Sequence, residues 1–392
     1  MRACMVAYTF YDADNRVRRY AEALARRGDQ VDAIALAREG QPAFEVLNGV
    51  RVFRIQTRVI DETGPFSYLF KLLQFFLRSA WFLAVRQVRE PYRIIHVHSV
   101  PDFEVFATIV PRLLGARVIL DIHDIVPEFY ASKFKVGERS FVFRILVWME
   151  RLSIAYSNHV IIANHIWYEK LVRRSVRADK CTAIINYPDP AIFSPRPRAA
   201  YAADEFTMCY PGTLSWHQGL DLAVEAMELL RERVPQLRFL MIGDGPERES
   251  LKRMIRDRAM EDRIKLTGMI PLEQVATTMA DVDLGVVPKR RDSFGNEAFS
   301  TKIMEFMAMG VSVLAARTRI DEYYFNDDLV QFFESGNAVD LAAKIADLVE
   351  HPERRAQLRN SAAEFIAKNN WDVRKQEYLE LVDRLAAGRP GK

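Results

Sequence analysis

Cysteine is scarce in this sequence, which has 392 residues and only Cys4, Cys181 and Cys209. The three cysteines are widely separated and lie mostly within apolar, strand-like runs. A disulfide framework needs several cysteines at regular spacing, and a zinc site needs them clustered with other ligands. We therefore expect neither of these, and we expect a reducing, cytoplasmic compartment.

A large net charge is also missing. The chain carries 55 basic and 52 acidic residues, a formal net charge of +3, so it lacks the broad positive field of a nucleic-acid-binding protein. Arginines nevertheless crowd one predicted helix: Arg16, Arg18, Arg19, Arg26 and Arg27. Such a cluster is usually a solvated helix face. The alternative is contact with acidic phospholipid, where each basic residue contributes about 1 kcal/mol.

The sequence has no long apolar run free of charges. Its most apolar stretch, residues 66–85, is interrupted by Lys71 and Arg78, and each of these is costly at the centre of a bilayer. We therefore do not predict a membrane-spanning helix. Burial inside the first domain is the favoured interpretation, and an amphipathic helix lying on anionic lipid is the alternative. The N-terminal residues MRACMVAYTF lack a cleavage site and are predicted to form the first strand.

Strand-like and helix-like segments alternate in both halves of the chain. With 49% apolar residues, the chain can bury the cores of two α/β domains. In the first half we predict strands at residues 3–8, 31–36, 94–97, 118–121 and 160–163, and a helix at 17–27. In the second half we predict strands at 207–210, 238–242, 264–266, 284–287 and 311–315, and helices at about 220–233 and 247–260. Strand–helix–strand order favours parallel pairing, so each half is predicted to be Rossmann-like, with ligands at the carboxyl ends of its strands.

The boundary between the halves is marked by proline. Residues 186–206, NYPDPAIFSPRPRAAYAADEF, contain four prolines, which exclude a continuous helix or a central strand. We therefore predict a first domain at 1–187, a linker at 188–205, a second domain at 206–371 and a last helix at about 372–387.

The most informative segment is residues 296–310, NEAFSTKIMEFMAMG, in which Glu297 and Glu305 are eight positions apart. An apolar stripe with a 3.6-residue period predicts a helix that begins at Ser300 or Thr301, with Glu297 in the loop before it. The unpaired N–H groups of a helix start suit a phosphate, and nearby carboxylates accept hydrogen bonds from sugar hydroxyls. The pattern thus indicates a nucleotide sugar, whereas the plainer interpretation is that Glu305 is a solvated surface residue.

This glutamate-x7-glutamate pattern resembles the hallmark of the retaining GT-B glycosyltransferases, in particular the large family four, and the resemblance extends over most of the chain. It implies an α/β fold of the GT-B type, with two Rossmann-like domains facing each other across a cleft. The first domain would hold the acceptor, the second would bind the nucleotide sugar, and the last helix would pack back on the first. The implied reaction is hexosyl transfer from a nucleoside diphosphate sugar to a hydroxyl with retention of configuration, without a metal ion or a cofactor.

Residues 210–219, YPGTLSWHQG, resemble the strand-turn-helix that holds the donor pyrophosphate in this family. Gly212 would allow the backbone to approach the phosphates closely. The family usually supplies an arginine and a lysine where this chain has Thr213 and Gln218, so both expected cations are missing.

Another cation must therefore balance the charge of a leaving diphosphate. Lys302, at the start of the predicted helix, is the favoured candidate, because some family members carry a Thr-Lys pair there. His217 and Lys289 are weaker candidates. Whether Lys302 replaces the missing pair is left open by the sequence.

Histidines follow or occupy two predicted strands. His123 lies at the carboxyl end of a strand, and a similar histidine contacts the donor sugar in family members, which implies a positioning role. A structural loop histidine is the alternative. His96 and His98 alternate along a strand and point to one face, a geometry that suits a metal. No third ligand is apparent at a useful spacing, so a structural role is favoured.

The resemblance implies two groups of site residues. The catalytic group is His123, Glu297 and Lys302, and the donor-binding group is Gly212, Thr213, Gln218, Gly243, Phe299, Ser300 and Glu305. Glu305 would bind the ribose hydroxyls, and Glu297 with the adjacent amides would bind the donor sugar. Gly243 belongs to a segment, MIGDGP, that is similar to the one lining the base and ribose in the family. No metal ligands are predicted.

The acceptor is the least defined partner. The aromatic and basic first domain favours a polyprenyl-linked saccharide at the cytoplasmic membrane face, as in surface polysaccharide assembly, with peripheral contact to that face and no nucleic acid. Two alternatives remain. One is a catalytically inactive accessory subunit that binds nucleotide or lipid-linked sugar, which the missing cations motivate. The other is a nucleotide-sugar epimerase, which would form product without an acceptor.

Overall fold

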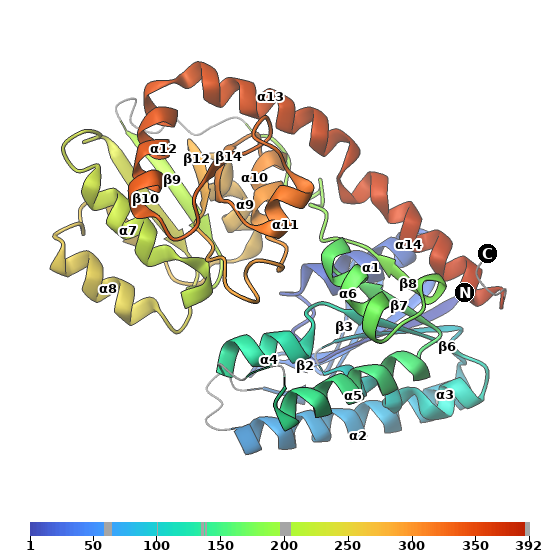
Figure 1. Cartoon of the computed structure of the whole chain (residues 1–392). Coiled ribbons are helices and arrows are strands. Elements are labelled where there is room, and N and C mark those ends of the chain that lie inside the picture. The colour runs from blue at the N-terminus through green and yellow to red at the C-terminus, as the bar shows by residue number, and fades with distance from the viewer. Residues whose placement is uncertain (59–64, 100, 135–136, 138, 197–204, 389–392) are drawn as a thin grey trace. The chain divides into compact units, whose positions relative to one another are not determined.

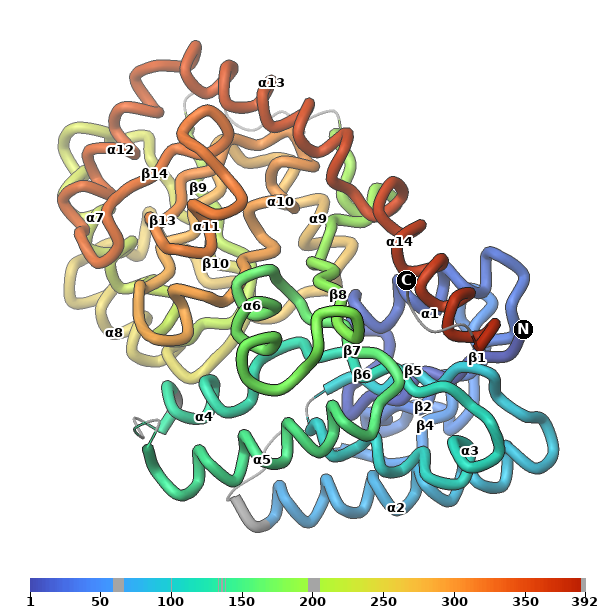
Figure 2. Tube along the Cα trace, turned by 45° about the vertical axis from the view of Figure 1, so that its right-hand side comes forward, coloured from blue at the N-terminus to red at the C-terminus, as the bar shows by residue number. Residues whose placement is uncertain are grey.

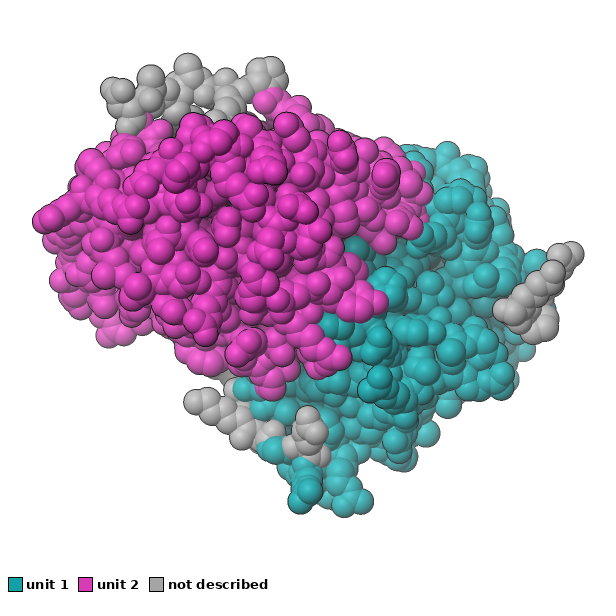
Figure 3. Space-filling model, turned by 45° about the horizontal axis from the view of Figure 1, so that its top comes forward, with its two compact units in different colours: residues 1–186, 375–392 teal, residues 187–374 magenta. Residues whose placement is uncertain are grey.

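The structure, a computed structural model, describes all residues except 59–64, 100, 135–136, 138, 197–204 and 389–392. The chain forms two compact units, which Figure 3 shows in different colours. Unit 1 comprises Met1–Asn186 and Lys375–Lys392, and unit 2 comprises Tyr187–Arg374. The predicted linker, residues 188–205, lies partly outside the described residues, and its described part contains no helix or strand.

Unit 1 is built on an eight-stranded sheet in the order β3-β4-β2-β1-β5-β6-β7-β8. The strands are β1 (Arg2–Ala7), β2 (Gln30–Ala37), β3 (Phe44–Leu47), β4 (Val50–Thr57), β5 (Ile94–His98), β6 (Arg117–Ile122), β7 (His159–Ile162) and β8 (Cys181–Ala183). Neighbouring strands are parallel except β3 and β4, which are antiparallel. The five predicted strands are confirmed. The strands β3, β4 and β8 were missed, and β3 and β8 are too short to give a periodic signal.

The helices of unit 1 cover both faces of this sheet (Figure 1). They are α1 (Asn15–Arg26), α2 (Pro65–Arg89), α3 (Ile109–Leu113), α4 (Val126–Phe134), α5 (Phe141–Tyr156), α6 (His165–Arg174) and, from Lys375 on, α14 (Trp371–Ala386), with the 3-10 turns η1 (Asp102–Thr108) and η2 (Ala178–Lys180). The helices α2 to α5 and η1 cover one face, and α1 and the later part of α14 cover the other. Asp14 caps α1 by accepting hydrogen bonds from the N–H groups of Arg16 and Val17.

Two expectations for the surface of unit 1 are wrong. Arg16 and Arg19 are not solvated, because they are only 4% and 3% exposed, and both donate to the side chain of Asn186. The helix α2 is not buried within the domain as a whole: Leu72, Phe75 and other side chains on one side are buried, whereas the opposite side is exposed. The periodic apolar content of α2 shows that it is a helix, but it does not show which side the domain covers.

Unit 2 is built on a six-stranded parallel sheet in the order β11-β10-β9-β12-β13-β14. The strands are β9 (Phe206–Pro211), β10 (Leu237–Ile242), β11 (Ile264–Leu266), β12 (Leu284–Val287), β13 (Ser312–Ala316) and β14 (Gln331–Phe333). The helices are α7 (Leu220–Leu229), α8 (Arg248–Asp257), α9 (Leu272–Ala280), α10 (Thr301–Ala308), α11 (Arg319–Tyr324), α12 (Ala338–Glu350) and α13 (Pro352–Lys368), with the 3-10 turn η3 (Trp216–Gln218). The five strands predicted for this half are confirmed, and α7 and α8 end three to four residues before their predicted ends.

The order of the strands in unit 2 reverses between β9 and β12. From β9 the chain adds β10 and β11 on one side, and it then returns to add β12, β13 and β14 on the other. The carboxyl ends of strands at such a reversal form the crevice where open α/β sheets bind ligands. Pro211, at the end of β9, and Val287, at the end of β12, mark this place in unit 2.

The helix α10 packs directly on β12. Gly285 in β12 has no side chain, and a Cβ there would come within 2.4 Å of the Phe306 ring. Ile303 and Met304 are also fully buried against this core. The loop that follows β12 leads into α10, so this packing holds the first turn of α10 at the carboxyl end of the strand.

Candidate active site

Two glycine turns meet at the carboxyl ends of β9 and β10. The N–H of Gly212 donates to the carbonyl of Ile242 at 2.7 Å, and the N–H of Gly243 donates to the carbonyl of Gly268 at 3.0 Å. Gly212 and Gly243 have φ angles of +138° and +134°, which L side chains rarely adopt. A Cβ on Gly243 would lie 2.0 Å from the carbonyl oxygen of Gly212. Only glycine therefore lets the two turns approach each other this closely.

Lys302 lies over the first of these turns. Its Nζ is 5.3 Å from the centre of the Tyr210 ring, and a Cβ on Gly212 would come within 2.5 Å of its Cε. The Tyr210 hydroxyl donates to the carbonyl of Thr213 at 3.0 Å, which fixes the turn beneath the lysine. Burial lowers the pKa of Lys302, and Glu305 opposes this shift. The structure thus places a cation at the turn where Thr213 stands in place of the family's arginine.

Glu305 follows Lys302 by about one turn of α10. Burial raises the pKa of the Glu305 carboxyl, and Lys302 and the hydroxyl of Thr301 act in the opposite direction. A carboxylate that has lost part of its water shell is stabilised by additional hydrogen-bond donors. Ribose hydroxyls are donors of this kind, so the setting suits the predicted role.

The loop before α10 is tied to α11. The N–H of Arg319 donates to Oδ1 of Asn296 at 2.8 Å, and the N–H of Ile320 donates to the carbonyl of Asn296 at 3.1 Å. The Arg319 guanidinium also lies 3.4 Å from the carboxylate of Glu297. The sequence did not predict Arg319 as a site residue, because no local pattern links α11 to the loop that carries Glu297.

The two weaker candidates for the phosphate cation already have carboxylate partners. Lys289 is 3% exposed, its Nζ donates to the carbonyl of Ala298 at 2.8 Å, and it lies 2.9 Å from Oδ2 of Asp321. Nδ1 of His217 lies 2.5 Å from Oδ2 of Asp292. Both pairs hold the loop after β12 in place, so the structure corrects the suggestion that Lys289 or His217 supplies the missing charge.

The remaining predicted donor residues are Phe299, Ser300 and Gln218. The Phe299 ring packs edge-on against Tyr324, with ring centres 4.9 Å apart, so this side chain belongs to the contact with α11. Ser300 is the N-cap residue of α10, but its side chain makes no capping hydrogen bond, contrary to expectation. Gln218 is the last residue of η3. It directly precedes Gly219, which has a φ of 63° and is the N-cap residue of α7. Within unit 2, the contact of Lys302 with Tyr210 and Gly212 joins the start of α10 to the first glycine turn.

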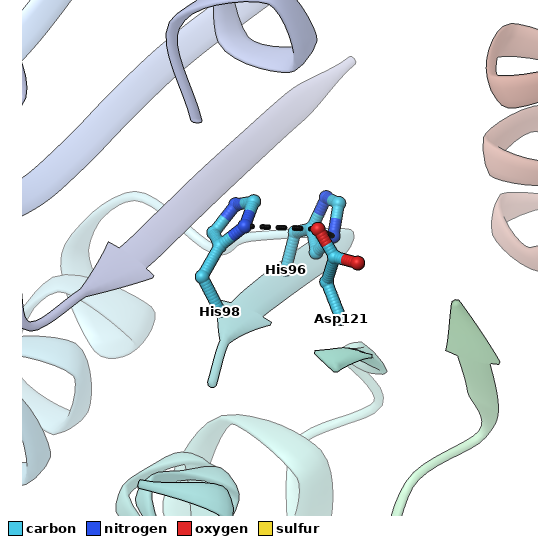
Figure 4. A group of neighbouring side chains, drawn as sticks. All are labelled: His96, His98 and Asp121. Atoms are coloured by element: carbon cyan, nitrogen blue, oxygen red, sulfur yellow. Dashed lines mark hydrogen bonds and ion pairs between the residues drawn. The ribbon is translucent and has the colours of Figure 1, made fainter. Parts of the chain in front are cut away.

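A buried charge cluster lies at the carboxyl end of β6 in unit 1 (Figure 4). Asp121 is fully buried, and it accepts hydrogen bonds from Nε and Nη2 of Arg16 at 2.8 and 2.6 Å. Nδ1 of His98 lies 3.2 Å from Oδ2 of Asp121, a contact that Figure 4 draws, and Nε2 of His123 lies 3.2 Å from the same oxygen. Although burial opposes it, Arg16 and His123 hold the pKa of Asp121 well below its usual value.

The cluster contains a third possible metal ligand, Asp121, beside the two strand histidines His96 and His98. The register of the sheet pairs His98 with Asp121, and ligand atoms of His96, His98 and Asp121 lie within 4.8 Å of one another. The expectation that no third ligand exists is therefore wrong. The guanidinium of Arg16 already binds both oxygens of Asp121, and Nδ1 of His96 lies 3.1 Å from the Tyr378 hydroxyl. A hydrogen-bonded cluster accounts for these contacts without a metal ion.

His123 is the partly exposed member of this cluster. Its side chain is 22% exposed, whereas that of Asp121 is fully buried. Burial lowers the pKa of His98 well below its usual value, with a further contribution from His96. The neutral His98 and the charged Asp121 together hold the ring of His123 in place, so His123 can present its remaining edge to a ligand.

The chain has two α/β units whose sheets are built mainly of parallel strands, and the second unit has a glycine-lined site where its strand order reverses. These features define a protein of the GT-B fold. A sucrose-phosphate synthase from Thermosynechococcus elongatus has the same fold, with a TM-score of 0.79 and 20% identity over 99% of this chain and 100% of that one. Anabaena HepE in complex with UDP gives a TM-score of 0.70 and 16% identity over 98% of this chain and 100% of that one.

The family follows from the sequence matches. Residues 196–365 match the glycosyl transferases group 1, and residues 13–186 match the glycosyl transferase 4-like domain. The chain belongs to the group 1 glycosyltransferases, as its resemblance implied.

Curated relatives span much of the chain at low identity. The gpi3 subunit of phosphatidylinositol N-acetylglucosaminyltransferase from Schizosaccharomyces pombe is 22% identical over 86% of this chain and 72% of that protein. One subunit of the human enzyme with the same name is 24% identical over 80% of this chain, which spans 61% of the human protein. A putative colanic acid biosynthesis glycosyltransferase, WcaL of Escherichia coli, is 27% identical over 38% of this chain and 37% of that protein.

Proposed function

We propose that this glycosyltransferase moves a hexosyl unit from a nucleoside diphosphate sugar to a hydroxyl of a lipid-linked saccharide, with retention of anomeric configuration and without a metal ion. The observation that carries the proposal is the position of Lys302 over the Gly212 turn at the strand reversal of unit 2. A cation, a glycine turn and a helix start at one place provide what a diphosphate needs.

The donor would be held by residues of unit 2. The diphosphate lies at the Gly212 turn and the start of α10, where Lys302 balances the charge that grows on the leaving group. Glu305 accepts hydrogen bonds from the ribose hydroxyls, which supply the donors that its desolvated carboxylate favours. Glu297, held by Arg319, and the neighbouring backbone N–H groups bind the hydroxyls of the sugar.

The transfer would proceed on one face of the sugar. The bond between the anomeric carbon and the phosphate oxygen breaks, and the acceptor hydroxyl forms its new bond from the same side. The departing phosphate oxygen takes the proton of that hydroxyl, so no protein base is needed. In this proposal His123 positions the sugar through a hydrogen bond, and the buried Asp121 fixes the orientation of the His123 ring.

The proposed acceptor is a polyprenyl-linked saccharide used in surface polysaccharide assembly. Two relatives support the assembly role by name: WcaL, in colanic acid biosynthesis, and AmsK of Erwinia amylovora, in amylovoran biosynthesis. Two other relatives are instead named for phosphatidylinositol, so both kinds of lipid acceptor belong in a screen. The enzyme would work in the cytoplasm, in peripheral contact with the inner membrane face.

Calorimetric titration with UDP, GDP and ADP in the presence of a chelator tests the donor site. We expect metal-free binding of one nucleotide in the wild type and a loss of about ten- to a hundredfold in affinity in Glu305→Ala, the value of a hydrogen bond to a charged group. Glu364→Ala, an exposed glutamate on α13, is the control and should bind as the wild type does. Equal affinity in Glu305→Ala and the wild type would remove Glu305 from the site.

Product analysis tests the reaction class. We expect a new glycoside, with the anomeric configuration of the donor, only when a lipid-linked saccharide is present. An inverted product contradicts the proposed mechanism. Product formed from the nucleotide sugar alone identifies an epimerase. Nucleotide binding without any product favours an accessory role, which is worth testing because the names of two relatives describe them as subunits.

A further inference from the structure

One face of unit 1 gathers most of the large apolar side chains that the described part of the chain leaves exposed. Apart from the adjacent Leu69 and Phe70, neighbours in this set on α2 are three, four or seven residues apart, so they form one stripe along the helix: Leu69, Phe70, Leu73, Leu77, Trp81 and Val88. Trp81 and Val88 are each 75% exposed. A contiguous apolar surface of this extent normally marks a contact with a partner or a membrane.

The helix α5 carries a second stripe beside the first. Its members are Phe141, Ile145, Trp148 and Leu152, and Trp148 is 58% exposed. Figures 1 and 2 both show α5 running alongside α2. The turn η1 joins the two helices, because Phe76 of α2 packs on Phe103 and Tyr156 of α5 packs on Phe106, with ring centres 6.0 and 5.0 Å apart.

The helix α3 extends the same surface. Ile109 and Leu113 of α3 are exposed, as is Leu114 directly after it, and Leu113 is 83% exposed. A shallow apolar hollow lies where Val110 meets Ala84, Val85 and Val88 of α2. We refer to the exposed sides of α2, α3 and α5 as the apolar face. It is made of three separate elements, so it is a surface of the folded unit and not of one helix.

The exposed charges on the apolar face all have one sign. On α2, α3 and α5 every exposed charged side chain is an arginine: Arg78, Arg89, Arg112, Arg144 and Arg151. The helix α2 contains no acidic residue. Glu150 of α5 is buried, with its carboxylate 2.5 Å from the guanidinium of Arg174. The face therefore combines apolar and tryptophan side chains with positive charge alone.

We propose that the apolar face docks unit 1 on the surface of an anionic lipid membrane. Apolar side chains and tryptophans enter the boundary between headgroups and acyl chains, and arginines bind the lipid phosphates. A second copy of the chain fits less well, because a two-fold contact through this face would bring the arginines of both copies together. The inference rests on the proposed lipid-linked acceptor and names the surface that would bring the enzyme to it.

The helix α2 would lie on the membrane and not cross it. In the part of the chain that the structure describes, the segment Ser67–Arg89 is long and apolar enough to span a bilayer by length and composition, with a mean hydropathy of 1.3. Its inner side, however, is held by the domain. Phe75 packs on Tyr8 with ring centres 5.2 Å apart, and the Gln87 side chain makes hydrogen bonds to both backbone groups of Tyr92. Spanning would break these contacts, whereas surface docking keeps them.

Vesicle flotation of the full chain tests the proposal. We expect the wild type to float with vesicles of phosphatidylcholine plus phosphatidylglycerol, to float much less with phosphatidylcholine alone, and to be released by salt, because each arginine near an anionic surface is worth roughly fivefold in affinity. The double variant Trp81→Ser/Trp148→Ser should bind anionic vesicles at least about tenfold less tightly. The double variant Arg89→Gln/Arg144→Gln should bind less tightly and lose much of its salt dependence.

Matched controls come from other exposed sites. Met269→Ser/Val339→Ser removes exposed apolar side chains from unit 2, and Arg173→Gln/Arg177→Gln removes exposed arginines from other parts of unit 1. Both should bind vesicles as the wild type does. Equal binding to neutral and anionic vesicles, no binding to either, or no effect of the tryptophan substitutions would overturn the proposal. The proposal would also be overturned if the wild type formed a dimer, if the double variant Trp81→Ser/Trp148→Ser were monomeric, and if the wild type did not bind vesicles.

Nucleotide titration of the same samples separates this inference from the proposed function. Vesicle binding requires no donor, and nucleotide binding requires no membrane. If nucleotide binds but vesicles do not, the apolar face has another role and the donor site stands. If vesicles bind but no nucleotide does, the docking surface stands and the proposed transfer fails. A variant that keeps its nucleotide affinity is also shown to be folded.

Discussion

The ammonium of Lys302 lies over the ring of Tyr210, with 5.3 Å between Nζ and the ring centre. Lys302 lies in the first turn of α10 and Tyr210 near the end of strand β9, and Gly212 leaves space for the lysine because it has no side chain. This contact places a positive charge at the glycine turn, although the residues beside that turn, Thr213 and Gln218, supply none. The proposed donor site depends on it.

Replacing Lys302 by alanine should weaken nucleoside diphosphate binding by about ten- to a hundredfold, since a hydrogen bond to a charged group is worth about 1.5–3 kcal/mol. Calorimetric titration measures the change. Lys368→Ala, which removes an exposed lysine from α13, should leave the affinity unchanged. If Lys302→Ala binds as the wild type does, another cation holds the diphosphate.

The same lysine predicts a pH dependence of nucleotide binding. Burial lowers the pKa of Lys302 from its ordinary value of 10.5, and only the protonated form attracts a diphosphate. Affinity should therefore be highest below the lowered pKa and fall as the pH rises through it, earlier than for an ordinary lysine. Titrations at increasing pH, with Lys302→Ala as the reference, measure this. A wild-type curve that follows the reference curve would exclude Lys302 as the titrating group.

Gly212→Ala should disrupt the turn beneath Lys302. The new Cβ would lie 2.5 Å from Cε of Lys302 in a backbone with φ of +138°, so we expect a loss of nucleotide affinity together with about 1–3 kcal/mol of stability. Gly336→Ala is the control, because Gly336 also has a positive φ, +88°, but has nothing within 4 Å of the new Cβ. Thermal unfolding and titration of both variants measure the effects. Gly336→Ala should lose some stability and keep its nucleotide affinity.

Asp121→Asn should destabilise unit 1 by about 3–5 kcal/mol, because it leaves the guanidinium of Arg16 buried without its carboxylate. Urea unfolding measures the loss. Asp179→Asn, which removes an exposed carboxylate paired with Arg177, should cost well under 1 kcal/mol. The double variant Arg16→Gln/Asp121→Asn should be less unstable than the sum of its parts. Additive losses would mean that the two residues do not act as a pair.

Acid should weaken unit 1 through its buried histidines. Burial lowers the pKa of His159 to about 4, whereas the unfolded chain binds a proton near pH 6.5. The contribution of neutral His159 to stability is therefore complete above about pH 6.5 and is lost as the pH falls toward 4, by about 1.4 kcal/mol per pH unit. His96 and His98, whose pKa values burial also lowers, act in the same direction.

Urea midpoints at about pH 7 and about pH 5 test this expectation. His159→Gln should reduce the loss of stability between the two pH values. His351→Gln, which changes an exposed histidine at the end of α12 whose pKa the Asp347 backbone raises, should leave the loss at least as large as in the wild type. An equal loss in His159→Gln and the wild type would show that His159 titrates normally.

Much of the fold could be predicted from local patterns. The strands of both sheets are short apolar runs separated by amphipathic segments, and this alternation is enough to predict two parallel α/β domains. The segment that carries Glu297, Lys302 and Glu305 is also continuous in sequence, so its helix and its loop could be predicted together. Residues that act through their neighbours along the chain are visible in this way.

Contacts between distant segments were decided by the tertiary structure. Asp121 meets Arg16, 105 residues earlier, and it meets His98 because β5 and β6 pair in a particular register. The sequence suggested Lys289 as a cation for the diphosphate, but in the fold its Nζ lies 2.9 Å from Oδ2 of Asp321. The apolar pattern of α2 predicts a helix, but only packing on the sheet determines which of its sides is exposed. The sequence by itself determined the elements and the continuous site segments, because these depend on periodicity and local chemistry. The tertiary structure decided which charges are paired and which surfaces are open, because strand register and helix packing depend on the whole unit.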